Sequence, residues 1–171
     1  MKNIPDKLTL FNVYKGGSKL IGLGEEVTLP DVEMGTEALS GAGILGEIDS
    51  PSKVNIGAME QELSFRMLDE DIFSIMDVGD GVDLTLRGGM QRMSGAGGIE
   101  EVGIRVIERG LFKGMTTGSL KQGSPMSAAV KLELIYILIE IDGEEKLEID
   151  KLNCVYKING KDILKKAREL S

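Results

Sequence analysis

Histidine and tryptophan are absent from the 171-residue sequence, and cysteine occurs once, at Cys154. Without histidine, the chain lacks the commonest general base and the usual partner of a nucleophilic serine or cysteine. Zinc sites also depend largely on histidines and clustered cysteines. We therefore expect no enzyme activity and no catalytic, cofactor-binding or metal-binding residues. The lone cysteine cannot form an internal disulfide, and its place in the run LNCVYKI predicts a small core residue.

Long apolar runs and aromatic residues are also scarce. The longest apolar run, LIYILI at residues 134–139, is far too short to span a membrane. The opening MKNIPDKL has no apolar segment typical of a signal peptide. We therefore expect the protein to be made and kept in the cytoplasm, at least at first. The formal net charge of −8 would repel nucleic-acid phosphates, which argues against an ordinary DNA-binding protein.

The chain is 42% hydrophobic, which predicts one globular domain over residues 1–171. Alternation of apolar and polar residues dominates and is typical of β-strands. Strands are expected at residues 7–14, 19–30, 58–68, 82–93, 99–112 and 131–150, and short helices at residues 69–79 and 159–170. Two long loops are expected at residues 31–53 and 113–127. This pattern predicts a mainly β fold, either a β-sandwich or a β-barrel.

The segment KLELIYILIEIDGEEKLEID predicts a β-hairpin around Asp142-Gly143. With a two-residue turn, Leu138 lies opposite Leu147 on a face that suits a core. The other face places isoleucines opposite charged residues: Ile135, Ile137 and Ile139 opposite Asp150, Glu148 and Lys146. A soluble domain normally leaves such a face polar on both strands, so the isoleucine row predicts a surface that something else covers. A later phase shift predicts a bulge or a bend near Lys151.

Four short motifs have common structural explanations. The run GAGILG at residues 41–46 matches the dinucleotide-binding pattern, but no helix is expected after it, which favours a connecting loop. The acidic cluster at residues 69–71 indicates a helix N-terminus, and the cluster at residues 142–145 indicates a hairpin tip, since neither has the spacing of a calcium loop. The basic residues Lys165, Lys166 and Arg168 favour the wet face of a terminal helix over a phosphate site.

Several motifs occur in the order seen in one known family. These are EVTLPDVEMGTEALSGAGILGEID near the start, VDLTLRGGMQRMSG in the middle, and the long stretch from VIERGLFKG to the hairpin DG, EID, LN and NGKD. In this shared order the chain resembles the major tail tube proteins of contractile-tailed bacteriophages and of phage-tail-like bacteriocins. It departs from the family pattern at Tyr136-Ile137-Leu138 and in its ending KKARELS.

The resemblance implies a β-sandwich or partly rolled β-barrel with a flanking helix and a short C-terminal helix. It implies a structural subunit of the inner tube of a contractile injection machine, present first in the host cytoplasm and then in the tail of a virion or bacteriocin particle. Six protomers would form a ring, rings would stack, and the tube would conduct DNA or ions through the target envelope. The implied partners are the chain itself, the sheath protein, baseplate and tail terminator proteins, a tape measure protein in the lumen, and passing DNA without specific binding.

The resemblance also implies that the long loop after VTLP reaches neighbouring protomers and the next ring. The residues expected at this interface are Glu33, Met34, Leu39, Gly41, Gly43, Ile44, Leu45, Gly46, Ile135, Ile137 and Ile139. One polar strand face is the expected lumen lining: Glu60, Glu62, Ser64 and Arg66. A small-ligand-binding β-barrel is the alternative, although such a protein usually has an aromatic lining and this chain has only seven aromatic residues, Phe 4 and Tyr 3.

Overall fold

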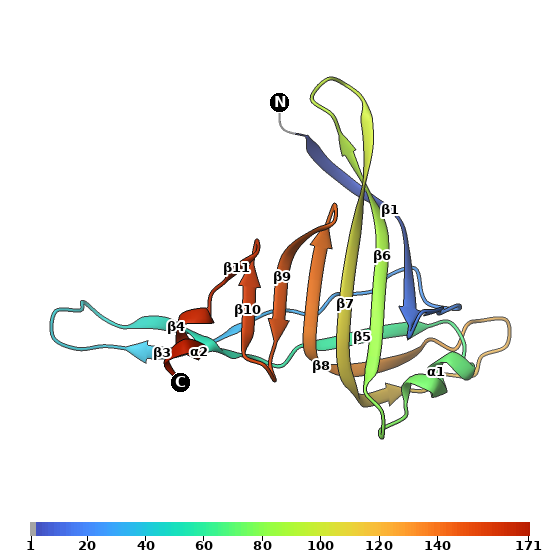
Figure 1. The fold of residues 1–171 in the computed structure, drawn as a ribbon. Coiled ribbons are helices and arrows are strands. Elements are labelled where there is room, and N and C mark those ends of the chain that lie inside the picture. The colour runs from blue at the N-terminus through green and yellow to red at the C-terminus, as the bar shows by residue number, and fades with distance from the viewer. Residues whose placement is uncertain (1–2) are drawn as a thin grey trace.

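The computed structural model describes residues 3–171 and shows a mainly β protein built around one large antiparallel sheet (Figure 1). Nine strands form this sheet in the order β11-β10-β9-β8-β7-β6-β1-β2, with β5 paired to β8. The bounds are β1 Ile4–Lys15, β2 Ser18–Lys19, β5 Glu60–Phe65, β6 Val82–Met93, β7 Ile99–Thr116, β8 Ala128–Ile141, β9 Glu144–Asp150, β10 Val155–Ile158 and β11 Lys161–Asp162. The expected mainly β fold is confirmed, although residues 3–171 do not close into a barrel.

Two short helices accompany the sheet, α1 (Glu70–Ile75) and α2 (Lys165–Leu170). The carboxylate of Asp69 caps α1 by accepting from the backbone N–H groups of Asp71 and Ile72, as the acidic cluster predicts. Within residues 3–171, neither helix has the length and apolar character needed to cross a membrane.

The central strands β6, β7 and β8 follow the expected alternation. Val82, Leu84 and Leu86 of β6 are buried on one face, and Val106 of β7 lies directly opposite Leu86. Leu132 and Leu134 continue the same core on β8. Because side chains alternate across a strand, the intervening residues of these strands form a second, polar face.

Two irregularities in the β7–β8 pairing divide the long strands into an upper and a lower half. The register shifts between Arg109 and Gly110, and again between Phe112 and Gly114. Gly110 is required here, because a Cβ atom would lie 2.5 Å from the Glu133 carbonyl oxygen. Bulges bend and twist a sheet, and the lower half of β8 pairs on its other side with β5.

The core is closed by pieces from elsewhere in the chain. Leu63 and Phe65 of β5 and Ile72 and Ile75 of α1 are fully buried within it. The irregular segment 20–32, expected to be a strand, passes over the sheet and contributes a few residues, among them Leu20 and Val27. The N–H of Gly24 donates to the carbonyl of Ser64, which ties this segment to β5.

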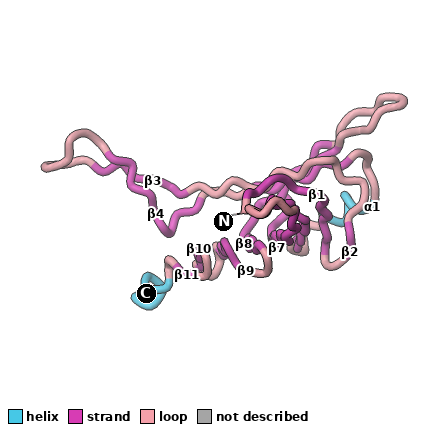
Figure 2. Tube along the Cα trace, turned by 90° about the horizontal axis from the view of Figure 1, so that it is seen from above, coloured by secondary structure: helices cyan, strands magenta, loops and turns pink. Residues whose placement is uncertain are grey.

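The first long loop expected from the sequence is instead a β-hairpin. Residues 34–39 form β3 (Met34–Leu39) and residues 48–56 form β4 (Ile48–Ile56), which pair only with each other. Figure 2 shows this hairpin, hereafter the arm (residues 34–56), projecting away from the main sheet. Glycines and Pro51 interrupt the alternation, so the sequence pattern did not indicate two strands.

The β8–β9 hairpin forms around Asp142 and Gly143, both with positive φ, but the expected register is wrong. A bulge at Lys146 shifts the pairing, so that Ile139 lies opposite Leu147 and Ile137 opposite Ile149. Ile137 is only 1% exposed, because the chain's own core covers it. Ile139 packs partly against the same core, and Ile135 is half-buried at the β7–β8 bulge. A neighbouring protomer is therefore not needed to cover Ile137.

The predicted irregularity near Lys151 is a complete chain reversal. Residues 151–154 form a turn, after which β10 runs back along β9 with Val155 opposite Asp150. Cys154 lies exposed in this turn with a φ of 51°, so the prediction of a core cysteine is wrong.

One carboxylate lies inside the core. Glu108 of β7 is fully buried, directly opposite Leu84 and Ile137, and neither of its carboxylate oxygens has a hydrogen-bond partner among residues 3–171. Burial raises the pKa of Glu108 to about 8, because a charged carboxylate is poorly solvated there. Glu108 is therefore mostly protonated at neutral pH.

We expect Ile137→Ala to lower the free energy of unfolding by about 3 kcal/mol, because it opens a cavity in the core. Ile135→Ala, at the half-buried bulge, is the matched control and should cost about 1 kcal/mol. Urea denaturation of both variants measures the difference. Equal costs would contradict the placement of Ile137 in the core.

The raised pKa of Glu108 predicts a pH-dependent stability. The contribution of Glu108 to the free energy of unfolding is fully present below the ordinary pKa of a glutamate. It falls as pH rises and levels off above about pH 8, because the unfolded chain releases the proton at a lower pH than the folded chain. Between pH 5 and pH 7 this loss amounts to about 3 kcal/mol. Urea denaturation at both pH values should show that Glu108→Gln removes most of this loss, whereas Glu101→Gln, an exposed residue of the same strand, does not. An unchanged pH dependence in Glu108→Gln would refute the prediction.

Candidate assembly interface

The described chain offers no cluster of residues typical of an active site. Within residues 3–171 no group of three or more Cys, Asp or Glu side chains is placed to hold a metal ion. The GAGILG run forms the end of the arm, where strand β4 follows instead of the helix that a dinucleotide site requires. The surfaces that stand out are the arm, one sheet edge and one polar sheet face.

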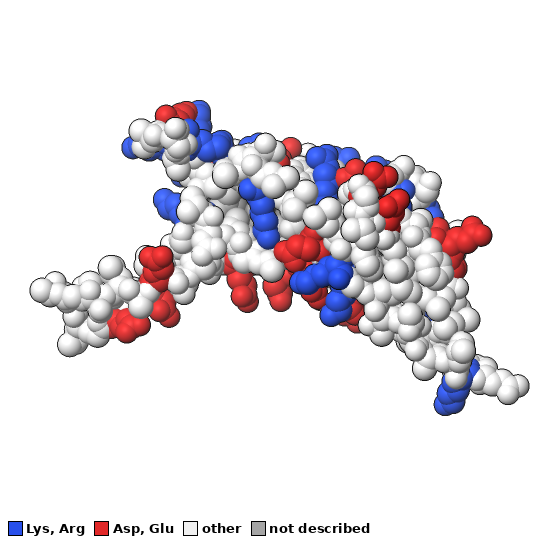
Figure 3. All heavy atoms as spheres, turned by 90° about the horizontal axis from the view of Figure 1, so that it is seen from below, with Lys and Arg blue, Asp and Glu red and all other residues white. Residues whose placement is uncertain are grey.

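The arm is an exposed two-stranded structure with apolar residues at its far end. Leu39 and Ile48 lie directly opposite each other and are each about half exposed, while Leu45 in the connecting turn is fully exposed. Residues 38–46 carry no charge, Glu47 follows directly, and Figure 3 shows no charged side chain at the outermost end of the arm. An isolated hairpin is marginally stable in water, so this arm is suited to packing against another surface.

The residues expected at the protomer interface are distributed unevenly. Glu33 lies at the base of the arm, where its carbonyl accepts from the N–H of Gly57, and Met34 packs partly against the core. Six others lie together at the far end of the arm: Leu39, Gly41, Gly43, Ile44, Leu45 and Gly46. The three isoleucines of β8 lie far from them in the fold, on a central strand of the sheet.

Strand β1 leaves a long edge of the sheet open. It pairs with β6 along its whole length, but within the described chain only Tyr14 and Lys15 pair with β2 on the other side. At the other end the sheet finishes with the two-residue strand β11. An open strand edge exposes unpaired N–H and C=O groups that can pair with another chain.

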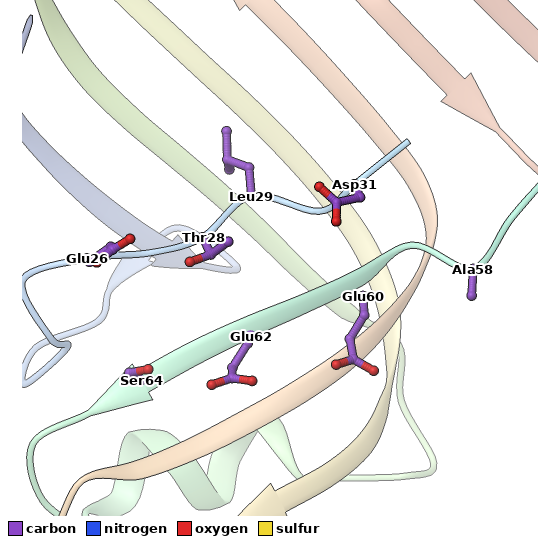
Figure 4. Close-up of a pocket in the computed structure, with 8 residues that line it drawn as sticks. All are labelled: Glu26, Thr28, Leu29, Asp31, Ala58, Glu60, Glu62 and Ser64. Carbon is purple, nitrogen blue, oxygen red and sulfur yellow. The ribbon is translucent and has the colours of Figure 1, made fainter. Parts of the chain in front are cut away.

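The residues expected to line a lumen lie on the polar face of β5. Glu60 and Glu62 project from one side of this strand, as Figure 4 shows, and Ser64 follows them, whereas Arg66 lies beyond the strand end. Glu60 lies directly opposite Glu133 of β8, which by itself would be repulsive. The ammonium of Lys113 lies 2.9 Å from Glu60 and 3.3 Å from Glu133 and so offsets that repulsion.

This ion pairing extends to the second lysine of the face. Lys131 lies 3.3 Å from Glu60 and 3.6 Å from Glu62. Hydrogen bonds from Lys113 and Lys131 lower the pKa of Glu60, and the same contacts raise the pKa values of both lysines. Glu60, Lys113 and Lys131 are therefore held in their ionised forms at neutral pH.

The polar face continues across the upper half of the sheet. The guanidinium of Arg109 lies 4.9 Å from the ring centroid of Tyr136, and its Nε atom lies 3.1 Å from the Asp83 carboxylate. The Tyr136 hydroxyl donates to Glu148 at 3.2 Å, and burial raises its pKa to about 12. Arg105 binds Glu140 through two hydrogen bonds of 2.5 and 2.8 Å.

The sequence analysis named Glu60 and Glu62 of this network but did not name Lys113 or Lys131. Lys113 lies in a segment expected to be a loop, and the structure extends β7 through it to Thr116. The available signal was the spacing of Arg105, Arg109 and Lys113, which are four positions apart. Residues an even number of positions apart in one strand lie on the same face.

The hollow beside Glu60 and Glu62 does not resemble a ligand-binding barrel. It has a volume of about 460 Å³ and lies between β5 and segment 26–31, which adds Glu26 and Asp31 to its lining (Figure 4). A polar hollow with four carboxylates gives an apolar ligand little surface to bind. The alternative of a small-ligand-binding barrel therefore gains no support from this site.

Comparisons with known proteins agree with the resemblance noted in the sequence. The family model of phage tail tube protein FII matches residues 5–170. The tail tube protein of Escherichia phage P2 is 30% identical over 168 residues, which cover 96% of each chain. The major tail tube protein of Serratia phage KSP20 is 31% identical over 160 residues, or 94% of this chain and 91% of that protein. The chain therefore belongs to the phage tail tube protein FII family.

Proposed function

We propose that the protein is a non-enzymatic structural subunit of the inner tube of a contractile phage tail or related injection machine. Copies assemble into hexameric rings, and the rings stack into a hollow tube. The observation that carries this proposal is the family match over residues 5–170, together with a chain whose sheet edge and arm are left without partners.

The open edge of β1 supports ring formation. Residues 4–12 of β1 have no strand on their outer side within the described chain, and the opposite end of the sheet finishes at β11. Pairing the β1 edge of one copy with the β11 end of the next would extend the sheet from copy to copy. A ring of such sheets has no free edge, which removes the aggregation hazard of an open strand.

The polar face supports a lumen. Its side chains are charged but tied to one another, as in the contacts of Lys113 with Glu60 and Glu133. With a net charge of −8, the chain would not bind a passing polyanion tightly. We assign Glu60, Glu62 and Ser64 to the lumen wall, through which DNA or ions pass. We assign the outer surface to the sheath, and the tube ends to baseplate and terminator proteins, with a tape measure protein inside.

We keep the arm residues in the proposed interface. At β8 we remove Ile137 from it, because the chain's own core covers that side chain. Leu39, Ile44 and Leu45 are the strongest candidates, because they are apolar residues at the far end of an unsupported hairpin. Such an assembly would form in the host cytoplasm and end in the tail of a virion or bacteriocin particle.

We expect the purified protein to form tubes at rising concentration, because burial of the arm and of the β1 edge favours association. Negative-stain electron microscopy should show long hollow tubes whose end views have six-fold symmetry. A protein that stays monomeric at every concentration and in the presence of short tube seeds would contradict the proposal.

The lumen assignment predicts size-selective labelling. In a Cys154→Ser background, Ser64→Cys should react in tubes with a small maleimide but resist a maleimide carrying a large polyethylene glycol, which cannot diffuse along the lumen. The free chain of the same variant, the control, should react with both reagents. Rapid reaction of the tube with both reagents would place Ser64 on the outer surface, and reaction with neither would place it in a contact.

A further inference from the structure

An apolar hollow opens beside β1, on the core face of the sheet. It has a volume of about 210 Å³, and its walls are almost entirely apolar. The apolar lining includes Leu8, Phe11, Val27, Leu29, Ile104 and Val106, and three charged residues, Glu25, Glu26 and Arg87, also border the hollow. Leu8 and Leu29 are each more than one-third exposed, so this β1 hollow is an incompletely covered part of the core. Segment 20–32 covers the core lower down but leaves the hollow open.

The far end of the arm has the matching chemistry. Leu45 is fully exposed, and Leu39 and Ile48 flank it as an exposed cross-strand pair. The absence of charge between residues 38 and 46 means that no charged side chain of this run would have to be desolvated on contact. A leucine side chain is also small enough to enter the hollow.

The arm cannot reach the β1 hollow of its own chain. Figure 1 shows the arm projecting beyond β11, whereas β1 lies at the opposite end of the sheet. In the strand order five strands, β10, β9, β8, β7 and β6, lie between β11 and β1. An arm that fills the hollow would therefore have to come from another copy of the chain.

We propose that the β1 hollow is the docking site for the arm of a second copy, with Leu45 as the inserted side chain. This inference rests on the proposed function and adds the receiving surface to it. If the β11 end of one copy meets the β1 edge of the next, its arm is carried past that edge and toward the hollow. Edge pairing and arm docking then join the same two copies.

The contact is heterologous, because the arm and the hollow are different surfaces of one chain. A heterologous contact leaves one free arm and one free hollow on every pair, so it propagates into a ring or an open filament and does not stop at a dimer. This property is what a ring-forming or tube-forming subunit needs.

Cross-linking of mixed variants tests the contact directly. In a Cys154→Ser background, Leu45→Cys and Leu8→Cys chains are mixed, allowed to assemble, treated with a short bismaleimide and resolved on a denaturing gel. The mixture should give covalent mixed dimers, and the double variant Leu45→Cys/Leu8→Cys should give a ladder of higher multimers. Leu45→Cys mixed with Val78→Cys, a site after α1 that is more exposed than Leu8, sets the background.

A second variant avoids any dependence on cysteine placement. Leu45→Asp should raise the concentration needed for tube formation about tenfold or more, because a charge would have to enter an apolar site. Its melting curve as a free chain should be unchanged, since Leu45 is fully exposed there. Leu120→Asp, in the exposed loop before β8, is the matched control.

The outcomes separate the two proposals. Tubes with no cross-linking above the Val78→Cys background, or with Leu45→Asp assembling as readily as Leu120→Asp, would overturn arm docking and leave the tube function intact. Absence of any assembly in the unaltered chain would overturn both.

Discussion

The pairing of β7 with β8 is the constraint on which the rest of the protein depends. These two strands form the middle of the sheet, and both bulges of their pairing lie near Gly110. Any side chain at that position would collide with the Glu133 carbonyl. The bend turns the lower half of β8 so that β5 can pair with it, which brings Leu63 and Phe65 into the core. It also brings Glu60 beside Lys113, so that core and polar network arise from one distortion of the backbone.

The same sheet is stable in its middle and incomplete at its margins. Ile137 and its neighbours are buried without help from another chain, whereas β1 has an open edge and the arm pairs only with itself. Stability and the proposed association would therefore use different residues. A subunit divided in this way can fold as a free chain and postpone its intermolecular contacts until enough copies are present.

Much of the fold can be predicted from the sequence where alternation is regular. The inward face of β6, the cap at Asp69 and the turn at Asp142 all follow from local patterns. The register of β8 and β9 does not follow from local patterns, because packing in the tertiary structure determines the bulge at Lys146. It places Ile137 opposite Ile149 and interrupts the ladder between β8 and β9. Counting residues outward from the turn cannot predict this bulge.

The arm of the candidate interface is also difficult to predict from the sequence. Glycines and Pro51 interrupt the alternation of the two arm strands, which pair with each other and not with the main sheet. Likewise, Glu108 follows the alternation of Val102 and Val106, so the pattern places it inward, whereas its chemistry argues for the surface. In this chain the pattern prevails, and the carboxyl group remains buried by keeping its proton.

A tube subunit needs two contacts that act together, and the geometry of this chain supplies a physical reason. Edge pairing alone would give sheets of any length, because backbone hydrogen bonds are nearly independent of sequence. In the proposed contact, an arm that reached past the same edge into an apolar hollow would add a side-chain contact that accepts only one register. The arm would therefore set the angle between neighbouring copies, and that angle decides whether a chain of copies closes into a ring or continues as an open filament.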